Sequence, residues 1–301
     1  MFPRPSHILF SACVLSLLFY DASLLYVVLR KRFKKKDDTT PTVYIVCMTF
    51  CGIINKVSHL LLIDGYVIST LIEGESGYEE EYRQFFGKQL SLISTWGYLT
   101  PIYFNWLMTI HRVCVVLLPA RVSLFQELPS LGYCITIMLI SFIDLLIPYY
   151  SICSINFHAH PATWISACAP DRHMLTWFQN KYTIYFPVSA MLVNFILIFY
   201  MKMKSGISSS SKAMLRTVAG TAVYLSIYEI GSLYIRLLPG SFDAQTSDFK
   251  DDFYFVRILT ICSLNFFVYF VITKTTRQLV LDFIGFKKKP IIRTITVTAT
   301  N

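Results

Sequence analysis

An arginine at the end of a long apolar stretch is the residue of this sequence best suited to switching chemistry. The run His111-Arg112-Val113 closes the stretch and is followed shortly by Pro119. A guanidinium in this position can pair with a neighbouring helix in one conformation and release it in another. The alternative is an arginine that extends its charged head to the lipid–water boundary and only helps to orient the chain. On this motif alone, the second interpretation is the simpler one.

Ionisable side chains inside apolar stretches form a second group of candidates. Such charges cost a few kcal/mol on insertion scales and usually face the interior of a helix bundle. Glu229 and Arg257 either pair with each other or bracket a polar ligand. Asp21 and Lys56 are expected to tether neighbouring helices, with the long lysine stem bridging a depth difference of about 10 Å. The full group is Asp21, Lys56, Asp144, Glu229, Arg236 and Arg257.

Aromatic side chains at similar depths are candidates for the wall of a ligand pocket. Tyrosines and tryptophans in such positions more often serve packing or an interfacial belt, so we expect only two or three of them to touch a ligand. Tyr98 and Tyr234 belong to the wider aromatic group. The predicted pocket residues are Trp96, Tyr103, Tyr185, Tyr228, Glu229 and Arg257.

Two of the eight cysteines, Cys153 and Cys168, fall in one predicted outer loop. An extracellular loop is oxidising, so one interpretation is a disulfide that closes a hairpin containing Trp164. The other is a zinc site that adds histidines of the same region. The spacing contains no close Cys-x-x-Cys pair, which disfavours zinc. The histidines concerned are His158, His160 and His173.

The motifs of common enzymes are absent from the sequence. There is no Gly-x-Ser-x-Gly, no His-Glu-x-x-His, and no Gly-x-Gly-Asp around Asp21 or Asp144. These motifs supply a nucleophile or a metal site with its general base. We therefore predict no enzyme activity, no catalytic residue, no metal and no cofactor.

Seven apolar stretches must position these residues. Each has about 20 residues or more, enough for a helix to cross a hydrocarbon core about 30 Å thick. Only 15% of the 301 residues are charged, against about 25% in soluble domains. The predicted fold is an all-α membrane protein, a seven-transmembrane helix bundle over residues 1–289 with a short cytoplasmic tail over 290–301. The predicted spans are 8–29, 42–63, 89–111, 131–152, 183–203, 214–238 and 253–273.

Basic residues divide unevenly between the two sides of this predicted bundle. Of the 27 Lys and Arg residues, 18 fall on one side and 6 on the other. The positive-inside rule makes the 18-residue side cytoplasmic, with the amino terminus outside. The acidic segments 73–81 and 243–252 fall outside, which is consistent. The net charge of +9 therefore indicates topology and contact with an anionic inner leaflet, and it excludes a nucleic-acid partner.

The last predicted span and the segment after it add two further signals. Asn265 and Tyr269 lie in its inner half as Asn-Phe-Phe-Val-Tyr. Beyond it, Leu279, Phe283 and Phe286 recur at helical spacing with three lysines at the end. This pattern predicts an amphipathic helix on the inner leaflet over residues 277–289.

Together these features resemble a divergent G-protein-coupled receptor. His-Arg-Val at 111–113 stands where Asp/Glu-Arg-Tyr is usual, and Asn265 to Tyr269 stands where Asn-Pro-x-x-Tyr is usual; Pro187 and the amphipathic helix fit as well. The stretch 105–119 is similar, more narrowly, to nematode serpentine chemoreceptors of the Srg superfamily, nearest the Srv-like or Srx-like branches. The chain departs from the wider pattern by lacking a cysteine at the outer start of the third span and an interior proline and tryptophan in the sixth.

The resemblance implies a function. An external small molecule would bind between the outer halves of spans three, five, six and seven and favour one helix arrangement. Segments 112–130 and 202–216 would then meet a heterotrimeric G protein, with Arg112, His111, Asn265 and Tyr269 as switch residues. The location implied is the plasma membrane, in a sensory cilium, and the role is olfactory.

The alternative function is a small-solute transporter or channel, which would also carry charges near the membrane midplane. Transporters usually show repeated halves with Gly- or Pro-broken helices at matching positions. Neither feature is found in this sequence. The receptor is therefore the favoured interpretation.

Overall fold

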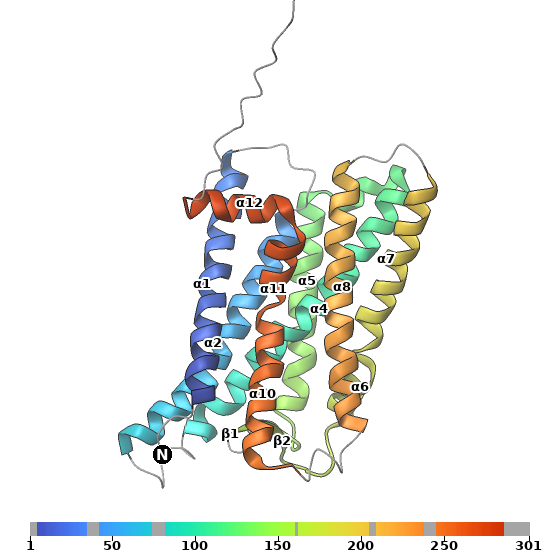
Figure 1. Cartoon of the computed structure of the whole chain (residues 1–301). Helices are drawn as coiled ribbons and strands as arrows, with labels where there is room; N and C mark the ends of the chain where they lie inside the picture. The colour runs from blue at the N-terminus through green and yellow to red at the C-terminus, as the bar shows by residue number, and fades with distance from the viewer. Residues whose placement is uncertain are drawn as a thin grey trace, which may run out of the picture.

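The computed structural model describes residues 5–34, 42–73, 82–159, 162–204, 209–237 and 245–285, which are almost entirely helical (Figure 1). The predicted tail 290–301 and most of the acidic segment 73–81 lie outside the described residues. The elements are α1 (Pro5–Lys34), α2 (Thr42–Glu73), η1 (Arg83–Gly87), α4 (Lys88–Leu117), η2 (Pro119–Phe125), α5 (Glu127–Tyr149), β1 (Ile155–Ala159), β2 (Ala162–Ser166), α6 (Met174–Tyr182), α7 (Tyr185–Met203), α8 (Ser209–Leu237), α10 (Ser247–Cys262), α11 (Leu264–Phe266), η3 (Phe267–Ile272) and α12 (Lys274–Phe283).

The distribution of polar and apolar side chains in the bundle is the one expected of a protein surrounded by lipid. Large apolar side chains are exposed along the outside, and polar or charged ones are buried between the helices. Lipid tails accept apolar surface freely, whereas backbone and side-chain polar groups must be satisfied inside the protein. Exposed examples are Leu15, Phe19, Leu139, Ile140, Ile143, Leu192, Ile196 and Phe199; buried examples are Asp21, Asn55, Lys56, Asn105, Arg112, Asn194 and Asn265.

Five stretches are long and apolar enough to cross a membrane. A bent pair, Ser247–Cys262 with Leu264–Ile272, forms a sixth with a bend of 40°. The predicted third span, 89–111, is helical as α4 but does not meet the same standard of hydropathy within the described residues. Length and composition therefore mark five or six crossings, where the sequence pattern predicted seven. The five are Pro5–Arg30, Thr42–Gly65, Glu127–Tyr149, Met174–Met203 and Met214–Ile235.

Helix α4 is less apolar because it lies among its neighbours rather than against lipid. It packs against α2, α5, α7 and α8, and its buried face carries hydroxyl, amide and charged groups. Gly97 permits the close approach to α2, since a Cβ there would lie 2.9 Å from the Cβ of Asn55. A central helix is thus recognised by its burial and not by its mean hydropathy.

Several predicted boundaries shift. The fourth span ends at Tyr149 rather than 152, because the chain turns into the segment before β1. The fifth begins earlier than 183, since α6 and α7 form one apolar stretch from Met174. The last span is interrupted at Ser263, where the hydroxyl of Tyr224 on α8 donates to the Thr260 carbonyl at 2.5 Å and lies 2.7 Å from the Ser263 hydroxyl.

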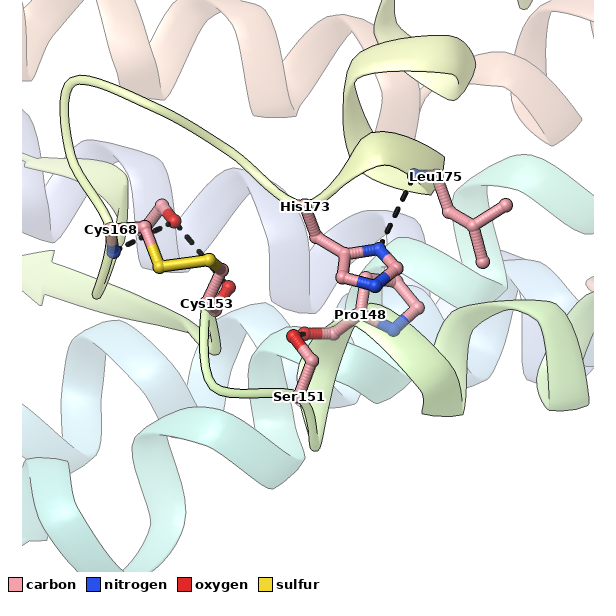
Figure 2. The surroundings of a disulfide bond; sticks show 7 residues. Pro148, Ser151, Cys153, Cys168, His173 and Leu175 are labelled. Atoms are coloured by element: carbon pink, nitrogen blue, oxygen red, sulfur yellow. Dashed lines mark hydrogen bonds between the residues drawn. A yellow bond between two sulfur atoms is a disulfide. The ribbon is translucent and has the colours of Figure 1, made fainter.

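The strands β1 and β2 form an antiparallel hairpin at the end of the bundle where the amino terminus lies (Figure 1). The structure joins Cys153 and Cys168, which flank the hairpin, by a disulfide (Figure 2). With both sulfurs bonded to each other, they cannot ligate zinc. His173 instead caps α6, its Nδ1 accepting from the Leu175 amide at 3.2 Å. His160 lies outside the described residues, within which no cluster of metal-ligating side chains occurs.

Helix α12 lies across the opposite end of the bundle (Figure 1). It begins at Lys274, three residues before the predicted start, and buries Thr276 and Val280. The Thr276 hydroxyl donates to the Tyr269 carbonyl, which fixes the turn out of the last span. Phe286 and the following lysines of the predicted amphipathic helix lie outside the described residues.

Candidate functional site

A cavity of about 270 Å³ lies beneath the hairpin, among helices α2, α4, α6, α8 and α10. Three of the predicted pocket residues, Tyr228, Glu229 and Arg257, are in its wall. Glu229 is 4% exposed and follows Tyr228 on α8, while Arg257 projects from α10. The tertiary structure thus brings a carboxylate and a guanidinium from two helices to one space.

Arg257 is held in place by aromatic neighbours. Its Nε donates to the Tyr228 hydroxyl at 2.9 Å, and its guanidinium carbon lies 5.8 Å from the centre of the Tyr228 ring. The ring centre of Trp164, on strand β2, lies 5.9 Å from the same carbon. Contacts of a cation with ring faces are attractive and strengthen as water is excluded. The guanidinium therefore has a fixed place between the hairpin and α8.

The other three predicted pocket residues lie elsewhere. Trp96 donates its indole N–H to the Met138 carbonyl of α5 at 2.9 Å. Tyr103 packs edge-on against Phe186 at 5.1 Å between ring centres, and the side chain of Tyr185 is 63% exposed. None of the three is among the described residues that line the cavity. The sequence gives only the position of a residue along its helix. That position did not distinguish residues that face the cavity from residues on the other faces of the same helices.

The sequence prediction missed several residues of the cavity wall. His59 of α2 is 3% exposed, and its ring centre lies 6.2 Å from that of Trp164. The Nδ1 of His59 and the Nε1 of Trp164 are buried without a hydrogen-bond partner among the described residues. Asn55, Lys56 and His59 stand close together inside an apolar stretch, a pattern that could have identified α2 as a wall of the site.

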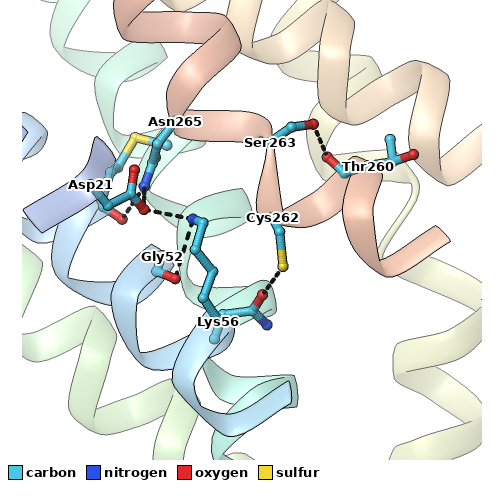
Figure 3. Close-up of polar contacts among 9 residues, drawn as sticks. Asp21, Gly52, Lys56, Thr260, Cys262, Ser263 and Asn265 are labelled. Atoms are coloured by element: carbon cyan, nitrogen blue, oxygen red, sulfur yellow. Dashed lines mark hydrogen bonds and ion pairs between the residues drawn. The ribbon is translucent and has the colours of Figure 1, made fainter. Parts of the chain in front are cut away.

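A buried ion pair joins α1 and α2 beside the cavity wall, where Lys56 follows the lining residue Asn55 (Figure 3). Lys56 Nζ is 2.6 Å from Asp21 Oδ2, and both side chains are at most 2% exposed. Asn265 of α11 donates from Nδ2 to the same carboxylate oxygen at 3.0 Å. The predicted tether between Asp21 and Lys56 is thus a direct contact between α1 and α2.

Close helix packing makes this ion pair compact. A Cβ at Gly52 would lie 2.2 Å from Asn265 Nδ2 and 2.8 Å from Asp21 Oδ2, so only glycine fits without rearrangement. The carbonyl of Gly52 also accepts from Lys56 Nζ at 3.4 Å (Figure 3). The neighbouring Asn55, in the cavity wall, contacts Cys262 of α10 at 3.6 Å between Oδ1 and Sγ. The pair and the cavity therefore share helix α2, which contacts α10 through Asn55 and Cys262.

The predicted switch residues Asn265 and Tyr269 both face α2. Asn265 is 3% and Tyr269 2% exposed. The Tyr269 hydroxyl contacts Met48 Sδ at 3.3 Å, and Asn265 Nδ2 also lies 3.4 Å from the Met48 carbonyl. Tyr269 lies in η3, a π-helical segment, a form that often occurs at functional positions.

Arg112 lies at the far end of α4 from the cavity and is 4% exposed, so its side chain is turned into the bundle. Its Nη2 contacts Met214 Sδ of α8, and its Nε is buried without a partner. No carboxylate of the described residues lies within ion-pair distance of its guanidinium. A buried cation left this way is costly unless another group satisfies it in a second state.

His111 links Arg112 to the loop that follows α4. Its ring stacks on Phe125 of η2, with 4.7 Å between centres and 8° between planes, and lies 5.8 Å from the ring of Tyr44. The predicted switch pair His111–Arg112 thus divides its contacts: the histidine holds the loop 119–125, and the arginine reaches α8.

These features describe a multi-pass membrane protein with an internal cavity near one end and a buried cation near the other. Comparison with known proteins gives its class. The family described as "Caenorhabditis serpentine receptor-like protein, class xa" matches residues 39–195. "Serpentine receptor class XA 10" of Caenorhabditis elegans is 31% identical over 323 residues, covering 97% of this chain and 94% of the relative.

The chain therefore belongs to the class XA serpentine receptors. The predicted resemblance to nematode serpentine receptors is confirmed, and so is the prediction that the protein is a receptor rather than an enzyme. The Srv-like or Srx-like branch is corrected to class XA, because the degenerate motifs around Arg112 and Asn265 do not separate the branches.

Proposed function

We propose that this serpentine receptor is a chemosensory G-protein-coupled receptor, which binds an external small molecule and signals to a cytoplasmic heterotrimeric G protein. The observation that carries the proposal is the placement of a ligand-sized cavity and a buried Arg112 toward opposite ends of α4, with no carboxylate of the described residues within ion-pair distance of the arginine. In a receptor, the ligand site and the switch residue must lie on one rigid element, or on elements that move together, so that binding at one affects the other.

The proposed topology has seven crossings, with α4 as the third and the bent α10–η3 helix as the seventh. Burial of the polar face of α4 supports this count, since a helix surrounded by others needs little lipid-facing surface. The excess of Lys and Arg on one side supports an amino terminus outside the plasma membrane. On that orientation α12 lies on the anionic inner leaflet, and the hairpin with its disulfide faces outward. A sensory cilium is the proposed location.

The proposed mechanism is a shift between two helix arrangements. A ligand favours the arrangement that it binds more tightly, and it shifts the equilibrium only by that difference in affinity. Movement of α8 away from α4 would release Arg112 from Met214. The guanidinium would then be available to an acceptor on the G protein, with segments 112–130 and 202–216 beside it.

The ion pair Asp21–Lys56 with Asn265 supplies a fixed point for this movement. It ties α1, α2 and α11 together, while the contact of α8 with Arg112 involves no charge pair. Helices α1 and α2 are therefore proposed as the static part and α8 as the moving part.

Expression in a heterologous cell with a cAMP or calcium reporter tests the proposal, with a panel of small odorants as probes. The expected result is a response that Arg112→Ala abolishes while surface staining stays at the wild-type level. Lys274→Ala, an exposed change on α12, is the matched control and should leave the response in place.

A response that persists undiminished in Arg112→Ala would remove Arg112 from its role. Odorant-dependent solute flux in vesicles, without any reporter signal, would instead favour the transporter or channel. Accessibility of tags at both chain ends from the same side of an intact cell would contradict the seven crossings.

A further inference from the structure

Arg257 presents unused hydrogen-bond donors at the cavity. Arginine has five N–H donors and no acceptor. Its Nε is used by Tyr228, whereas Nη1 and Nη2 make no hydrogen bond with any residue that the structure describes. The side chain is partly exposed and lines the cavity, so these donors are open to a ligand. Only a ligand with acceptor atoms can satisfy them.

The charges of the wall favour an anion. Two arginines, Arg172 and Arg257, line the cavity, and Glu229 is the single carboxylate among the described lining residues. Lysine would offer a point charge, but the planar guanidinium matches the two oxygens of a carboxylate with parallel bonds. Glu229 opposes an anion by repulsion, so the balance between Glu229 and Arg257 sets the affinity.

The remainder of the wall combines aromatic and aliphatic side chains with uncharged polar ones. The polar residues include Asn55, His59, Thr95 and Gln179, and the apolar part includes Tyr98, Tyr149, Trp164, Leu145, Ile258 and Ile261. The volume, about 270 Å³, is smaller than the cavities of about 300–1,000 Å³ that hold drug-sized molecules. The ligand must therefore be small, and the apolar part of the wall suits a compact apolar body.

We infer that the ligand is a small monocarboxylate with an apolar or aromatic body, bound through its carboxylate to Nη1 and Nη2 of Arg257. This inference deepens the receptor function proposed above and rests on it. Trp164 and Tyr228 orient the guanidinium before the ligand arrives, which lowers the entropy cost of binding. The hairpin forms part of the cavity wall through Thr163, Trp164 and Ser166, and a charge-assisted hydrogen bond is stronger within such a wall than in open water.

The test uses the purified full-length receptor in lipid nanodiscs and measures its unfolding temperature with added probes. Each probe is a carboxylate paired with its neutral amide: acetate with acetamide, hexanoate with hexanamide, and phenylacetate with phenylacetamide. A ligand that binds only the folded protein raises Tm, and at a fixed concentration the increase grows with the logarithm of its affinity. We expect phenylacetate or hexanoate to raise Tm and the matching amide to raise it much less.

Four variants sharpen the test. Arg257→Gln should weaken carboxylate binding about 10- to 100-fold and amide binding much less, because the amide carries no charge. Arg257→Lys should give an intermediate loss, because it keeps the charge and loses the fork. Glu229→Gln should strengthen carboxylate binding about threefold by removing the repulsion. Lys181→Gln, which removes a positive charge from α6 outside the cavity wall, is the matched control and should change nothing.

The inference is overturned if no carboxylate of the series raises the wild-type Tm more than its amide does, or if Arg257→Gln keeps the preference. Should Arg257→Gln fail to fold, the wild-type preference and the direction of the Glu229→Gln effect decide. The receptor proposal fails separately: a reporter response to neutral odorants that needs Arg112 would uphold it even with no carboxylate preference.

Discussion

Lys56 and Arg112 are both cationic, both less than 5% exposed, and both on long central helices, yet their surroundings are opposite. Lys56 has a carboxylate oxygen at 2.6 Å, and that oxygen also accepts from Asn265. Among the described residues, Arg112 has a thioether contact and a buried Nε without a partner. The first arrangement pairs the buried cation with a carboxylate, although the other oxygen of that carboxylate, Asp21 Oδ1, is buried without a hydrogen-bond partner among the described residues. The second has no carboxylate acceptor in the described part of the chain, as expected of a group reserved for another conformation or another protein.

This difference indicates which substitutions should affect stability and which should affect signalling. Removing one member of a buried ion pair leaves a charge without compensation, whereas removing a buried cation that has no counter-ion also removes the cost of burying it. Substitutions near Lys56 should therefore act on folding, and substitutions at Arg112 should act on signalling.

The largest expected effect is that of Lys56→Met. It leaves the Asp21 carboxylate buried with only the amide of Asn265, and we expect a loss of about 3–5 kcal/mol in the free energy of unfolding. Thermal unfolding in detergent and surface staining measure it. The double variant Asp21→Leu with Lys56→Met should be more stable than Lys56→Met alone, and Lys274→Met serves as the exposed control. A wild-type Tm in the single variant would refute the tether.

Opening the outer loop is expected to have the next largest effect. Cys153 and Cys168 are 15 residues apart, and in the chain-entropy account a loop of this size contributes about 3 kcal/mol. Replacing both with serine should lower Tm and weaken the odorant response, since the hairpin carries Trp164 over the cavity. Cys114→Ser, at a free and half-buried cysteine, is the control. If neither Tm nor the odorant response changes in the double serine variant, the hairpin keeps its position without the disulfide.

A smaller effect is expected at Gly52. In Gly52→Ala the new methyl group would displace Asn265 from Asp21, at a cost of about 1–3 kcal/mol typical of overpacking. Gly132→Ala on α5 is the matched control, because a Cβ there meets nothing within 4 Å. Equal Tm values for the two alanine variants would mean that the packing around the ion pair relaxes easily.

The smallest effect on stability is expected for Arg112→Met. Methionine retains the apolar stem and removes the charge, so the free energy of unfolding should change by no more than about 1 kcal/mol. Signalling should nevertheless be lost in the reporter assay. A stability loss as large as that of Lys56→Met would show that Arg112 is structural, and the contrast between the two cations would disappear.

Much of the fold could be predicted from the sequence, because a helix that faces lipid must be apolar over about 20 residues. The first, second, fourth, fifth and sixth predicted spans coincide with stretches that are long and apolar in the structure. The third was also predicted from the sequence, but helix α4 does not meet the hydropathy standard of the other five, since its polar face is buried against other helices. The break at Ser263 was also not predictable, because it depends on Tyr224 from another helix.

The sequence by itself determined which residues carry charge inside apolar stretches, and hence that Asp21, Lys56 and Arg112 must each find an internal environment. Only the tertiary structure decided which environment each one has. The sequence gives the position of a residue along a helix, but not the neighbouring helix that its side chain faces. Arg257 and Tyr228 therefore lie together at the cavity, whereas Trp96 faces α5. Partners that are far apart in the chain are chosen by packing, and packing is a property of the whole bundle.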